Sequence, residues 1–233
     1  MIFPQLIKSI QANDKVLEIG PGGNPFYRSN VLLEKKYENK EEWEAQCGGQ
    51  KPDNKGKTIF YYNGVDFPFK SNEFDYIICS HVLEHVDDVD KFVSEIKRVG
   101  KKGYFEFPLI YYDFLYNFPE HQVFLYYKDE TIKWMRKEDT NIADFKEIQL
   151  FFNKTLQLKY SSLIEDLCFF FFQGIEWTDN IKTERVKSIK DLCHDINEIV
   201  IPVKQINISS KKILDVSLKN KIKSKLIHLI NKM

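Results

Sequence analysis

Residues 15–23, Lys-Val-Leu-Glu-Ile-Gly-Pro-Gly-Gly, decide how this chain is expected to fold. The run from Val16 to Ile19 is short, apolar and partly β-branched, which is typical of a buried strand. Glycines follow it at once. Because glycine has no Cβ, the backbone amides of such a turn can approach a ligand closely. A Gly-x-Gly after a strand also occurs in plain tight turns, so the surrounding sequence must decide between the two.

Further apolar runs alternate with connecting segments along the first half of the chain. A helix is predicted to begin at Asp87 or Asp88 and to end at Gly100, because apolar residues recur there at spacings of three and four. Strands that alternate with crossovers indicate an α/β fold: a mostly parallel, Rossmann-like sheet with helices on both faces, ligands at the carboxyl ends of the strands, and a C-terminal extension. The expected strands are 15–19, 31–33, 58–62, 74–80 and 104–108.

The other segments give weaker patterns. Only eight residues, 23–30, separate Gly22 from Val31, too few for a helical crossover between parallel strands. We expect a core domain over 1–128, a part that completes the sheet and the acceptor site over 129–210, and a basic tail over 211–233. The remaining predictions are helices at 5–11, 129–137, 144–166, 186–199 and 218–230, a helical turn near 41–45, and a strand at 168–173.

Composition fits a protein of the cytoplasm. The 233 residues are 43% hydrophobic and 29% charged, no stretch approaches the ~20 consecutive apolar residues of a spanning helix, and the start lacks the pattern of a signal peptide. The four cysteines show no Cys-x-x-Cys spacing, so we expect free thiols. The aromatic run at 168–173 and Trp177 favour a core or a dimer interface over a cofactor-binding role.

The charge is unevenly distributed along the chain. Residues 211–233 hold seven lysines and one acid, a charge of +6, which leaves −6 on the first 210 residues of a chain whose net charge is 0. An acidic body argues against a nucleic-acid partner. Apolar residues on one helical face of the tail are compatible with contact with an anionic membrane surface, peripheral to the inner membrane face, although packing on the body is the favoured alternative.

Three ordered motifs resemble the class I S-adenosylmethionine-dependent methyltransferases. VLEIGPGG at 16–23 is similar to the first motif of that family, DFPFKSNEFDYIICSHVLEHV at 66–86 to its LPF…FD…LEHV region, and RVGKKGYFEFP at 98–108 to the segment that follows. The likeness extends over residues 14–108. Within the family, the chain is most similar to a subgroup often found in bacterial surface-polysaccharide gene clusters. That subgroup shares the pattern GPGGNPF…R…VLL-[DE]-K and a later Glu-His near an aromatic stretch.

The resemblance implies S-adenosylmethionine as cofactor and S-adenosylhomocysteine as product. Gly20 and Gly22 would bracket the methionine and ribose, and Glu34, at the end of a strand, would accept hydrogen bonds from the ribose diol. Asn63 stands where the family usually has an Asp on the adenine amine, and its carbonyl oxygen could accept the same bond. Arg28 would hold the cofactor carboxylate or be an ordinary surface residue. The predicted cofactor-binding set is Glu18, Gly20, Pro21, Gly22, Gly23, Asn24, Arg28, Glu34, Asn63, Gly64, Val65, Ser80 and His81.

The methyl acceptor is expected to be a small or glycan-type molecule. Methyl transfer is an in-line displacement that mainly requires positioning, and a base is needed only for a protonated nucleophile such as a sugar hydroxyl. His81 and His121 are the candidate catalytic bases. His121 ends an aromatic-rich segment, 111–121, expected to be a loop whose rings either face a sugar or only cap the sheet. O-methylation of a sugar, nucleotide sugar or surface polysaccharide is the predicted reaction. N-methylation of a small amine and a non-catalytic cofactor-binding protein remain alternatives.

His81-x-x-Glu84-His85 also matches a zinc-peptidase pattern, with two imidazoles one helical turn apart. In that pattern the motif lies within a long helix, whereas here it opens a connection after a predicted strand. We therefore expect no metal site, and a metal-dependent hydrolase that uses these three residues is the least favoured function.

Overall fold

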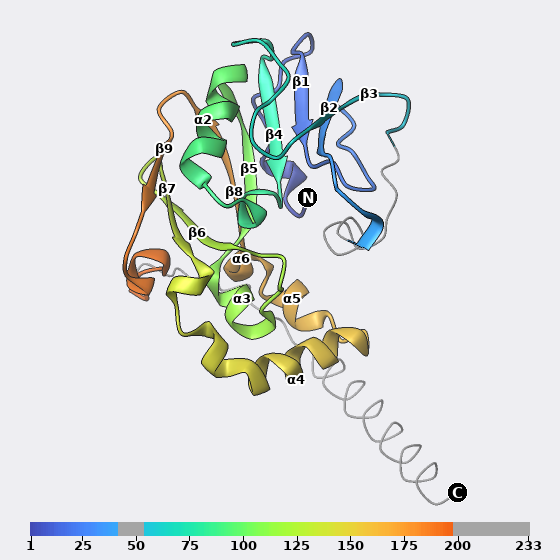
Figure 1. Ribbon diagram of the computed structural model, residues 1–233. Helices are drawn as coiled ribbons and strands as arrows, with labels where there is room; N and C mark the ends of the chain where they lie inside the picture. The colour runs from blue at the N-terminus through green and yellow to red at the C-terminus, as the bar shows by residue number, and fades with distance from the viewer. Residues whose placement is uncertain (42–53, 198–233) are drawn as a thin grey trace, which may run out of the picture. The chain divides into compact units, whose positions relative to one another are not determined.

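A six-stranded sheet forms the centre of the computed structural model, which describes residues 1–41 and 54–197 (Figure 1). The strand order is β3-β2-β1-β4-β5-β8; the first five strands are parallel, and β8 is antiparallel to β5. This confirms the predicted α/β fold with a mostly parallel sheet. The bounds are β1 Val16–Ile19, β2 Val31–Lys35, β3 Thr58–Tyr62, β4 Tyr76–Ser80, β5 Lys102–Pro108 and β8 Phe172–Thr178.

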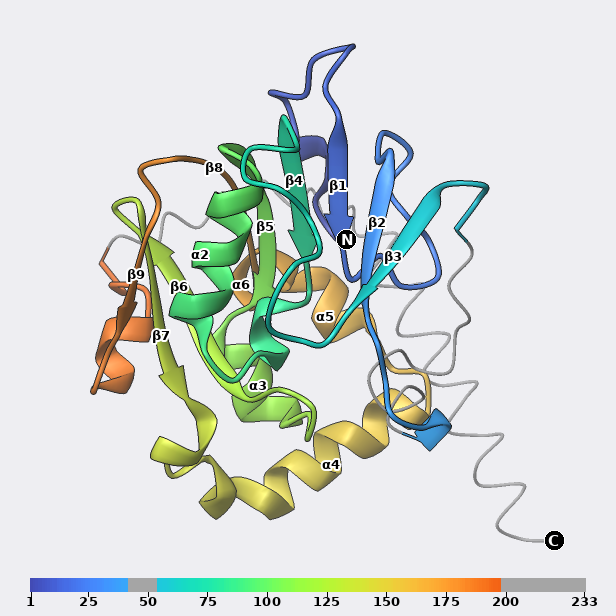
Figure 2. The ribbon, with the colours of Figure 1, turned by 45° about the horizontal axis from the view of Figure 1, so that its top comes forward.

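Helix α2, Val89–Val99, covers one face of this sheet and lies in front of it in Figure 2. The side chain of Asp88 caps the helix by accepting from the backbone N–H of Lys91, as the sequence predicts. Its buried residues are the five that recur on one face: Val89, Phe92, Val93, Ile96 and Val99.

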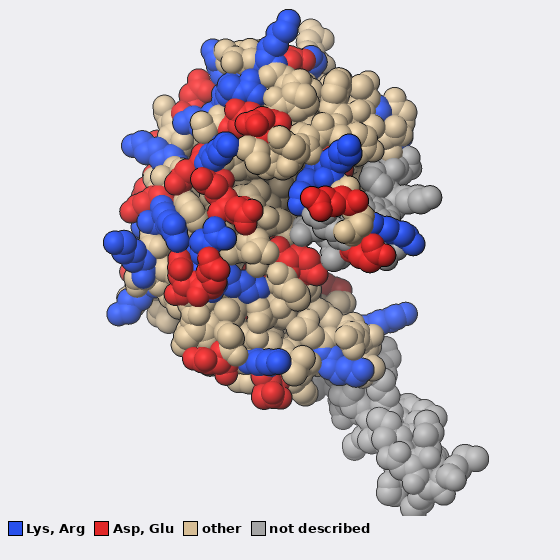
Figure 3. Space-filling view, viewed as in Figure 1, with Lys and Arg blue, Asp and Glu red and all other residues tan. Residues whose placement is uncertain are grey.

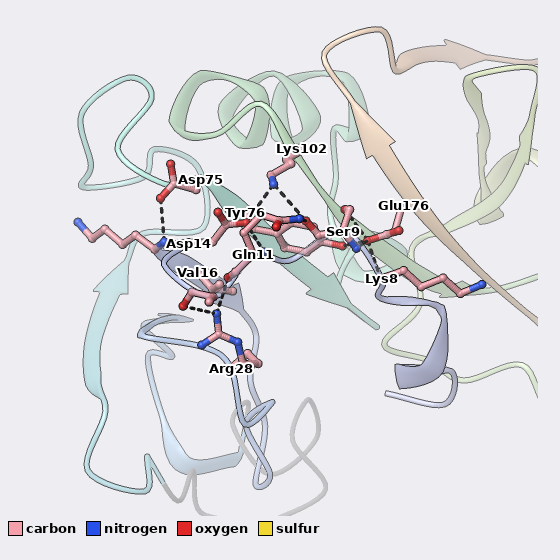
Figure 4. Close-up of polar contacts among 12 residues, drawn as sticks. Lys8, Ser9, Gln11, Asp14, Val16, Arg28, Asp75, Tyr76, Lys102 and Glu176 are labelled. Atoms are coloured by element: carbon pink, nitrogen blue, oxygen red, sulfur yellow. Dashed lines mark hydrogen bonds and ion pairs between the residues drawn. The ribbon is translucent and has the colours of Figure 1, made fainter.

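The opposite face of β1, β4 and β5 is covered by the N-terminal segment and by Phe26 from the loop after β1. Leu6, Ile7, Ile10 and Phe26 pack there against Val16, Tyr76, Ile78 and Tyr104. The helix predicted over 5–11 is only the 3₁₀ turn η1, Pro4–Leu6. The backbone N–H groups of Lys8 and Ser9 instead donate to Glu176 on β8, at 3.0 and 2.9 Å, and therefore do not form helical hydrogen bonds (Figure 4).

A second, three-stranded sheet has the order β6-β7-β9, with β6 Val123–Lys128, β7 Thr131–Arg136 and β9 Lys182–Arg185. The helix predicted over 129–137 is therefore wrong. Asp129 and Glu130 both have positive φ, 52° and 54°, which makes the two-residue turn of a β-hairpin. Ile132 and Trp134 are buried while Thr131 and Lys133 are less so, the alternation of a strand.

The remaining helices are short. The aromatic segment 111–121 is mostly helix α3, Ile110–Tyr116, rather than a loop. The helix predicted over 144–166 is divided into α4, Lys146–Gln157, and α5, Ser162–Asp166, and Lys159 between them has φ of 64°. Residues 168–173 are not one strand, because α6, Cys168–Phe171, precedes β8. The 3₁₀ turns are η2 Leu83–His85, η3 Lys137–Asp139, η4 Ile142–Phe145 and η5 Ile189–Leu192, the last in place of the helix predicted over 186–199.

Met1–Cys193 form one compact unit, and one apolar cluster contains buried residues of both sheets. The domain division at residue 128 stays a prediction. Several predictions lie outside the described residues: the turn near 41–45 apart from residue 41, the helix at 218–230, and the tail. Cys47 lies outside them as well, whereas Cys79, Cys168 and Cys193 are free thiols, as expected. Within the described ranges, no helix is long and apolar enough to cross a membrane. Acidic and basic side chains are interspersed over the face drawn in Figure 3.

Candidate active site

A cavity of about 1010 Å³ lies at the carboxyl ends of β1, β2, β3 and β4. This is the edge where parallel α/β sheets bind ligands, and the volume is that of a large small-molecule site. Every residue of the predicted cofactor set except Arg28 lines it. Residues outside the predicted cofactor set also line it, among them Tyr27, Tyr37, Lys55, Tyr62 and His85.

The glycine loop after β1 lies close to the segment after β4. Gly20 and Gly22 have φ of 61° and 56°, a region that glycine occupies without strain. A Cβ on Gly20 would lie 2.5 Å from Cγ2 of Val82, so only glycine fits there without displacing that side chain, whereas a Cβ on Gly22 would meet nothing within 4 Å. The chain thus uses Gly20 for close approach and Gly22 for conformation.

Glu18 supports the connection that replaces a helix between β1 and β2. Its Oε2 accepts from the backbone N–H of Phe26 at 2.8 Å and from the hydroxyl of Ser29 at 2.7 Å. Burial raises the pKa of Glu18 despite both bonds. Glu18 lines the cavity, but its hydrogen bonds are directed at the loop.

Glu34 presents a carboxylate oxygen to the cavity from the end of β2. Its side chain is 4% exposed, and burial raises its pKa. The hydrogen bonds that it accepts, from Lys35 N–H and the Tyr37 hydroxyl, both reach Oε1. Oε2 therefore remains available to a ligand hydroxyl.

Asn63 uses its carbonyl oxygen within its own turn. Oδ1 accepts from the backbone N–H groups of Val65 and Asp66, at 2.9 and 3.0 Å. Both lone pairs are thereby occupied. The expected acceptance of an adenine amine by this oxygen does not fit the conformation, and the amide Nδ2 is the group left for a ligand.

Arg28 lies away from the cavity. Its Nη2 donates to the carbonyl oxygens of Gln11 and Ala12, at 2.7 and 3.1 Å (Figure 4). The guanidinium fastens the N-terminal segment to the loop after β1. The expectation that Arg28 holds the cofactor carboxylate is corrected accordingly.

His81 lies between two carboxylates at the end of β4. Its Nδ1 is 3.2 Å from Oε1 of Glu84, and its Nε2 is 3.1 Å from Oε1 of Glu106. Burial opposes its charge, but the hydrogen bonds to Glu106 and Glu84 outweigh burial and raise the pKa of His81 to about 9. At neutral pH it is a cation with no free lone pair, which is unsuited to a general base.

Glu106 on β5 is a buried acceptor that sequence reasoning missed. Burial opposes its ionisation, yet hydrogen bonds from His81, the Phe3 N–H and the Tyr104 hydroxyl hold the pKa of Glu106 at about 2. It also accepts from the Ile2 N–H and the Ser80 hydroxyl. The available signal was a lone acid in the apolar strand Tyr-Phe-Glu-Phe, because a buried charge needs partners.

His121 does not line the cavity but belongs to a cluster behind it with Glu84 and His85. One ligand-capable atom from each of the three lies within 4.8 Å of the others. His121 Nδ1 donates to both carboxylate oxygens of Asp113 at 2.9 Å, and His85 Nδ1 donates to the Glu120 carbonyl at 3.0 Å. Burial and the neighbouring His121 lower the pKa of His85, whereas the Asp113 carboxylate raises the pKa of His121 against its burial.

The aromatic side chains of α3 pack against one another. Tyr112 stacks on Phe118 with centroids 5.3 Å apart and contacts Phe172 at 4.8 Å, and Tyr116 is fully buried. Of the two interpretations of these rings, the packing favours the one in which they cap the sheet. Tyr27, 80% exposed at the cavity, is an aromatic ring accessible to a ligand.

Residues 38–105 match the family model described as a methyltransferase domain. The match begins three residues after β2 ends, extends into β5 and does not include the glycine loop. Among curated proteins, an uncharacterized protein of Methanocaldococcus jannaschii, MJ1123, is 39% identical over 49 residues, which are 21% of this chain and 24% of that protein.

Solved structures resemble parts of this fold at low identity. An S-adenosylmethionine-dependent methyltransferase from Mesorhizobium loti is 18% identical with a TM-score of 0.31, over 42% of this chain and 48% of that one. The YcgJ protein from Bacillus subtilis is 22% identical with a TM-score of 0.34, over 48% of this chain and 56% of that one. The likeness thus spans a quarter of the curated relative and about half of each solved chain.

Proposed function

We propose that this chain, whose residues 38–105 match a methyltransferase domain, transfers a methyl group from S-adenosylmethionine to a hydroxyl of a small or glycan-type acceptor. The observation that carries the proposal is the convergence on one cavity of the glycine loop, Glu34, residues 63–65 and the end of β4. These groups come from four parallel strands, and the sequence predicted them as one ligand site.

The residues present fit S-adenosylmethionine. Glu34 offers Oε2 to a ribose diol, the Gly20–Gly23 turn offers backbone groups without an intervening side chain, and Asn63 offers an amide N–H to a ring nitrogen. When bound, this cofactor supplies an electrophilic methyl group on a sulfonium. The protein's part is to hold the cofactor and to orient the acceptor, because correct positioning of the two reactants lowers the barrier to transfer.

Methyl transfer to a hydroxyl oxygen requires that the hydroxyl lose its proton, whereas a neutral amine can attack the methyl group without losing one first. The exposed Tyr27 ring at the cavity suits the apolar face of a sugar. Its presence supports a sugar, nucleotide sugar or polysaccharide component as acceptor. Methylation of a small amine, and cofactor binding without catalysis, are the competing functions.

The first test is thermal unfolding of the purified protein with S-adenosylmethionine, S-adenosylhomocysteine and, as a control, NAD. A ligand at 100 times its dissociation constant adds about 2.7 kcal/mol to the free energy of unfolding. Both adenosyl ligands should raise Tm and NAD should not. Glu34→Gln should weaken binding about tenfold, because an amide accepts the diol bond without the carboxylate's charge. Glu147→Gln, an exposed acid on α4, is the matched control.

The acceptor is then identified with isotopically labelled methyl donor and panels of nucleotide sugars, oligosaccharides and small amines. Label in an ether-linked methyl group of a sugar would support the proposal, and label only in amines would favour the competing enzyme. Binding of the adenosyl ligands without transfer to any panel would favour the non-catalytic alternative. Equal stabilisation by NAD, or none by the adenosyl ligands, would refute the assigned cofactor site.

A further inference from the structure

Glu84, His85 and His121 converge beside the cofactor cavity without forming hydrogen bonds to one another. We propose that these three side chains bind one divalent transition-metal ion, of the kind that Zn²⁺ exemplifies. Because His85 also lines the cavity, an open coordination position would face the acceptor. The role toward the acceptor rests on the proposed function, whereas metal binding itself does not.

Two segments distant in sequence bring the three side chains together. Glu84 and His85 lie in η2, directly after β4, and His121 lies between α3 and β6. The backbone N–H of Gln122 donates to the carbonyl of Glu84 at 2.6 Å and joins the segments at this point. The His85 and His121 rings meet edge to face, with centroids 5.0 Å apart.

Glu84 supplies a carboxylate oxygen that nothing else in the described chain satisfies. Its side chain is 1% exposed; Oε1 accepts from His81, and Oε2 is buried with no hydrogen-bond partner. A carboxylate oxygen is strongly solvated when it is exposed to water, so burying it without a hydrogen-bond partner is costly and calls for an explanation. A cation bound at Oε2 provides that explanation.

Both imidazoles are held with one ring nitrogen free. The Nδ1 atoms donate to the Glu120 carbonyl and to the Asp113 carboxylate, which fixes the proton on Nδ1 and leaves a lone pair on Nε2. Neither Nε2 takes part in a hydrogen bond among residues 1–41 and 54–197. Ligation through one nitrogen with the other bonded to a carbonyl or a carboxylate is the usual arrangement of metal-binding histidines.

The donor set and the spacing indicate the class of ion. Two imidazole nitrogens and one carboxylate oxygen suit Zn²⁺, Fe²⁺, Co²⁺ or Mn²⁺ better than Mg²⁺ or Ca²⁺, which prefer oxygen ligands. Atoms bonded to one Zn²⁺ at about 2.0–2.2 Å lie roughly 3.4 Å apart in tetrahedral geometry. The ligand-capable atoms lie within 4.8 Å of one another, so binding one ion would draw each pair together by at most about 1.4 Å.

The trio differs from the one that the zinc-peptidase pattern suggests. His81 cannot be a ligand in this conformation, because both of its ring nitrogens are bonded to carboxylates. His121, 36 positions after His85 in the sequence, takes its place. The prediction that the chain has no metal site rested on the place of the motif and on the motifs on both sides of it, and it did not consider a residue from another segment.

A metal at this place would answer the need for a base. An acceptor hydroxyl that ligates the ion has its own pKa lowered and gives its proton to water. Its oxygen then attacks the methyl carbon; the C–O bond forms as the C–S bond breaks, and the sulfur keeps the electron pair as the thioether of S-adenosylhomocysteine. His81 remains a cation throughout and takes no proton.

The experiment uses the full-length protein, stripped with a chelator and titrated with Co²⁺ and Zn²⁺, with Mg²⁺ as a control ion. Binding is measured by the visible absorption of Co²⁺ and by bound-metal analysis after dialysis. The wild type should bind one equivalent of Co²⁺ or Zn²⁺, which Mg²⁺ at equal concentration does not displace. His121→Gln and Glu84→Gln should weaken binding at least tenfold, and Asp113→Asn 10- to 100-fold through the orientation of His121. His194→Gln, outside the cluster, should bind as the wild type does.

The Tm increase caused by S-adenosylhomocysteine is recorded on every variant as an independent readout of folding. It should persist in His121→Gln, because His121 does not line the cavity. A wild type that is stabilised by S-adenosylhomocysteine but binds no Co²⁺ or Zn²⁺ would refute the metal site and leave the proposed function standing. Metal binding that survives both ligand variants would place the ion elsewhere and equally refute it. Metal binding lost as expected, without any response to the adenosyl ligand, would confirm the site and refute the proposed function.

Discussion

Glu106 shows at the residue scale how one buried charge organises the end of the sheet. It accepts from backbone groups of the N-terminal segment, from hydroxyl groups on β4 and β5, and from His81. The two carboxylates beside His81 need a cation between them, so the imidazole is held charged. The same contacts that make His81 a poor base make it a good support for the cavity edge.

The ionisation of Glu106 predicts a loss of stability in acid. Its native pKa of about 2 lies below its ordinary value of 4.5, so the stabilisation is complete above pH 4.5 and is lost as the pH falls toward 2. The difference corresponds to about 3 kcal/mol. Urea unfolding at pH 5 and pH 2.5 measures the greater part of this difference. Glu106→Gln should reduce the loss between the two pH values, and Tyr104→Phe, which removes one donor, should reduce it less.

Glu147→Gln, an exposed acid on α4, is the control and should retain the wild-type pH dependence. An unchanged dependence in Glu106→Gln would show that other carboxylates dominate acid unfolding. Tyr104→Phe keeps the measurement informative if Glu106→Gln does not fold, since it leaves the charge and its other donors in place.

Sequence reasoning found the residues of the cavity because they follow their strands directly. Gly20, Glu34 and Ser80 end or follow parallel strands that are neighbours in the sheet, and a strand's end can be located from its apolar run alone. Glu106 and the pairing of His85 with His121 were not found, because their partners come from segments far away in sequence. The role of Arg28 was left open between two alternatives for the same reason, since its acceptors lie 16 and 17 positions before it.

At the scale of the element, the connection from β1 to β2 does without a helix. Gly20 N–H donates to the Leu33 carbonyl at 2.9 Å, Glu18 holds Phe26 and Ser29, and Asn30 N–H donates to the Val16 carbonyl. These bonds satisfy backbone groups that a helix would otherwise pair internally. The loop is thus held in one conformation by hydrogen bonds, and its glycines Gly20 and Gly22 differ in how closely other side chains approach them.

Gly20→Ala should destabilise the protein more than Gly22→Ala. Both substitutions place a Cβ at positive φ, which costs about 1–2 kcal/mol, and only Gly20→Ala adds the clash with Val82. Overpacking of that kind costs about 1–3 kcal/mol more. Denaturant unfolding gives the two values. Val82→Ala should recover part of the loss in Gly20→Ala and none in Gly22→Ala, whereas equal losses in the two glycine variants would contradict the assigned contact.

The elements predicted correctly are those whose pattern and surroundings agree. The four buried residues of β1 and the capped, one-sided helix α2 need no information from elsewhere. The hairpin at 123–136 was missed because its turn, Asp129-Glu130, lacks the glycine that usually marks positive φ. The segment 168–173 failed because α6 passes directly into β8, and an apolar run cannot show where a helix becomes a strand.

At the scale of the whole unit, one apolar core joins the two sheets. The cluster that contains Ile77 and Phe105 of the central sheet also contains Ile132 and Trp134 of the second, with α2 between them. The indole N–H of Trp134 donates to Asp90 on α2 at 2.9 Å. A shared core couples the stability of its parts.

Met1–Cys193 should therefore unfold in a single transition. Circular dichroism in increasing urea and native-state hydrogen exchange measure this, and amides of β4 and β6 should exchange with the same free energy of opening. Two separate transitions, with β6 and β7 lost before β4 and β5, would instead support an independent domain boundary at residue 128. Trp134→Ala, which would leave a cavity in the shared core, should move a single midpoint without splitting it.

The covering of one sheet face by residues 1–11 has a consequence for the order in which the chain assembles. Ser9 is bonded to Glu176, and Phe3 to Glu106, across 167 and 103 positions of sequence. Residues 1–11 thus have no complete docking site until β5 and β8 are both in place. Contacts of such separation form late, because the intervening chain must be ordered first. The sheet face that residues 1–11 cover is accordingly expected to be the last part of the central sheet to be buried.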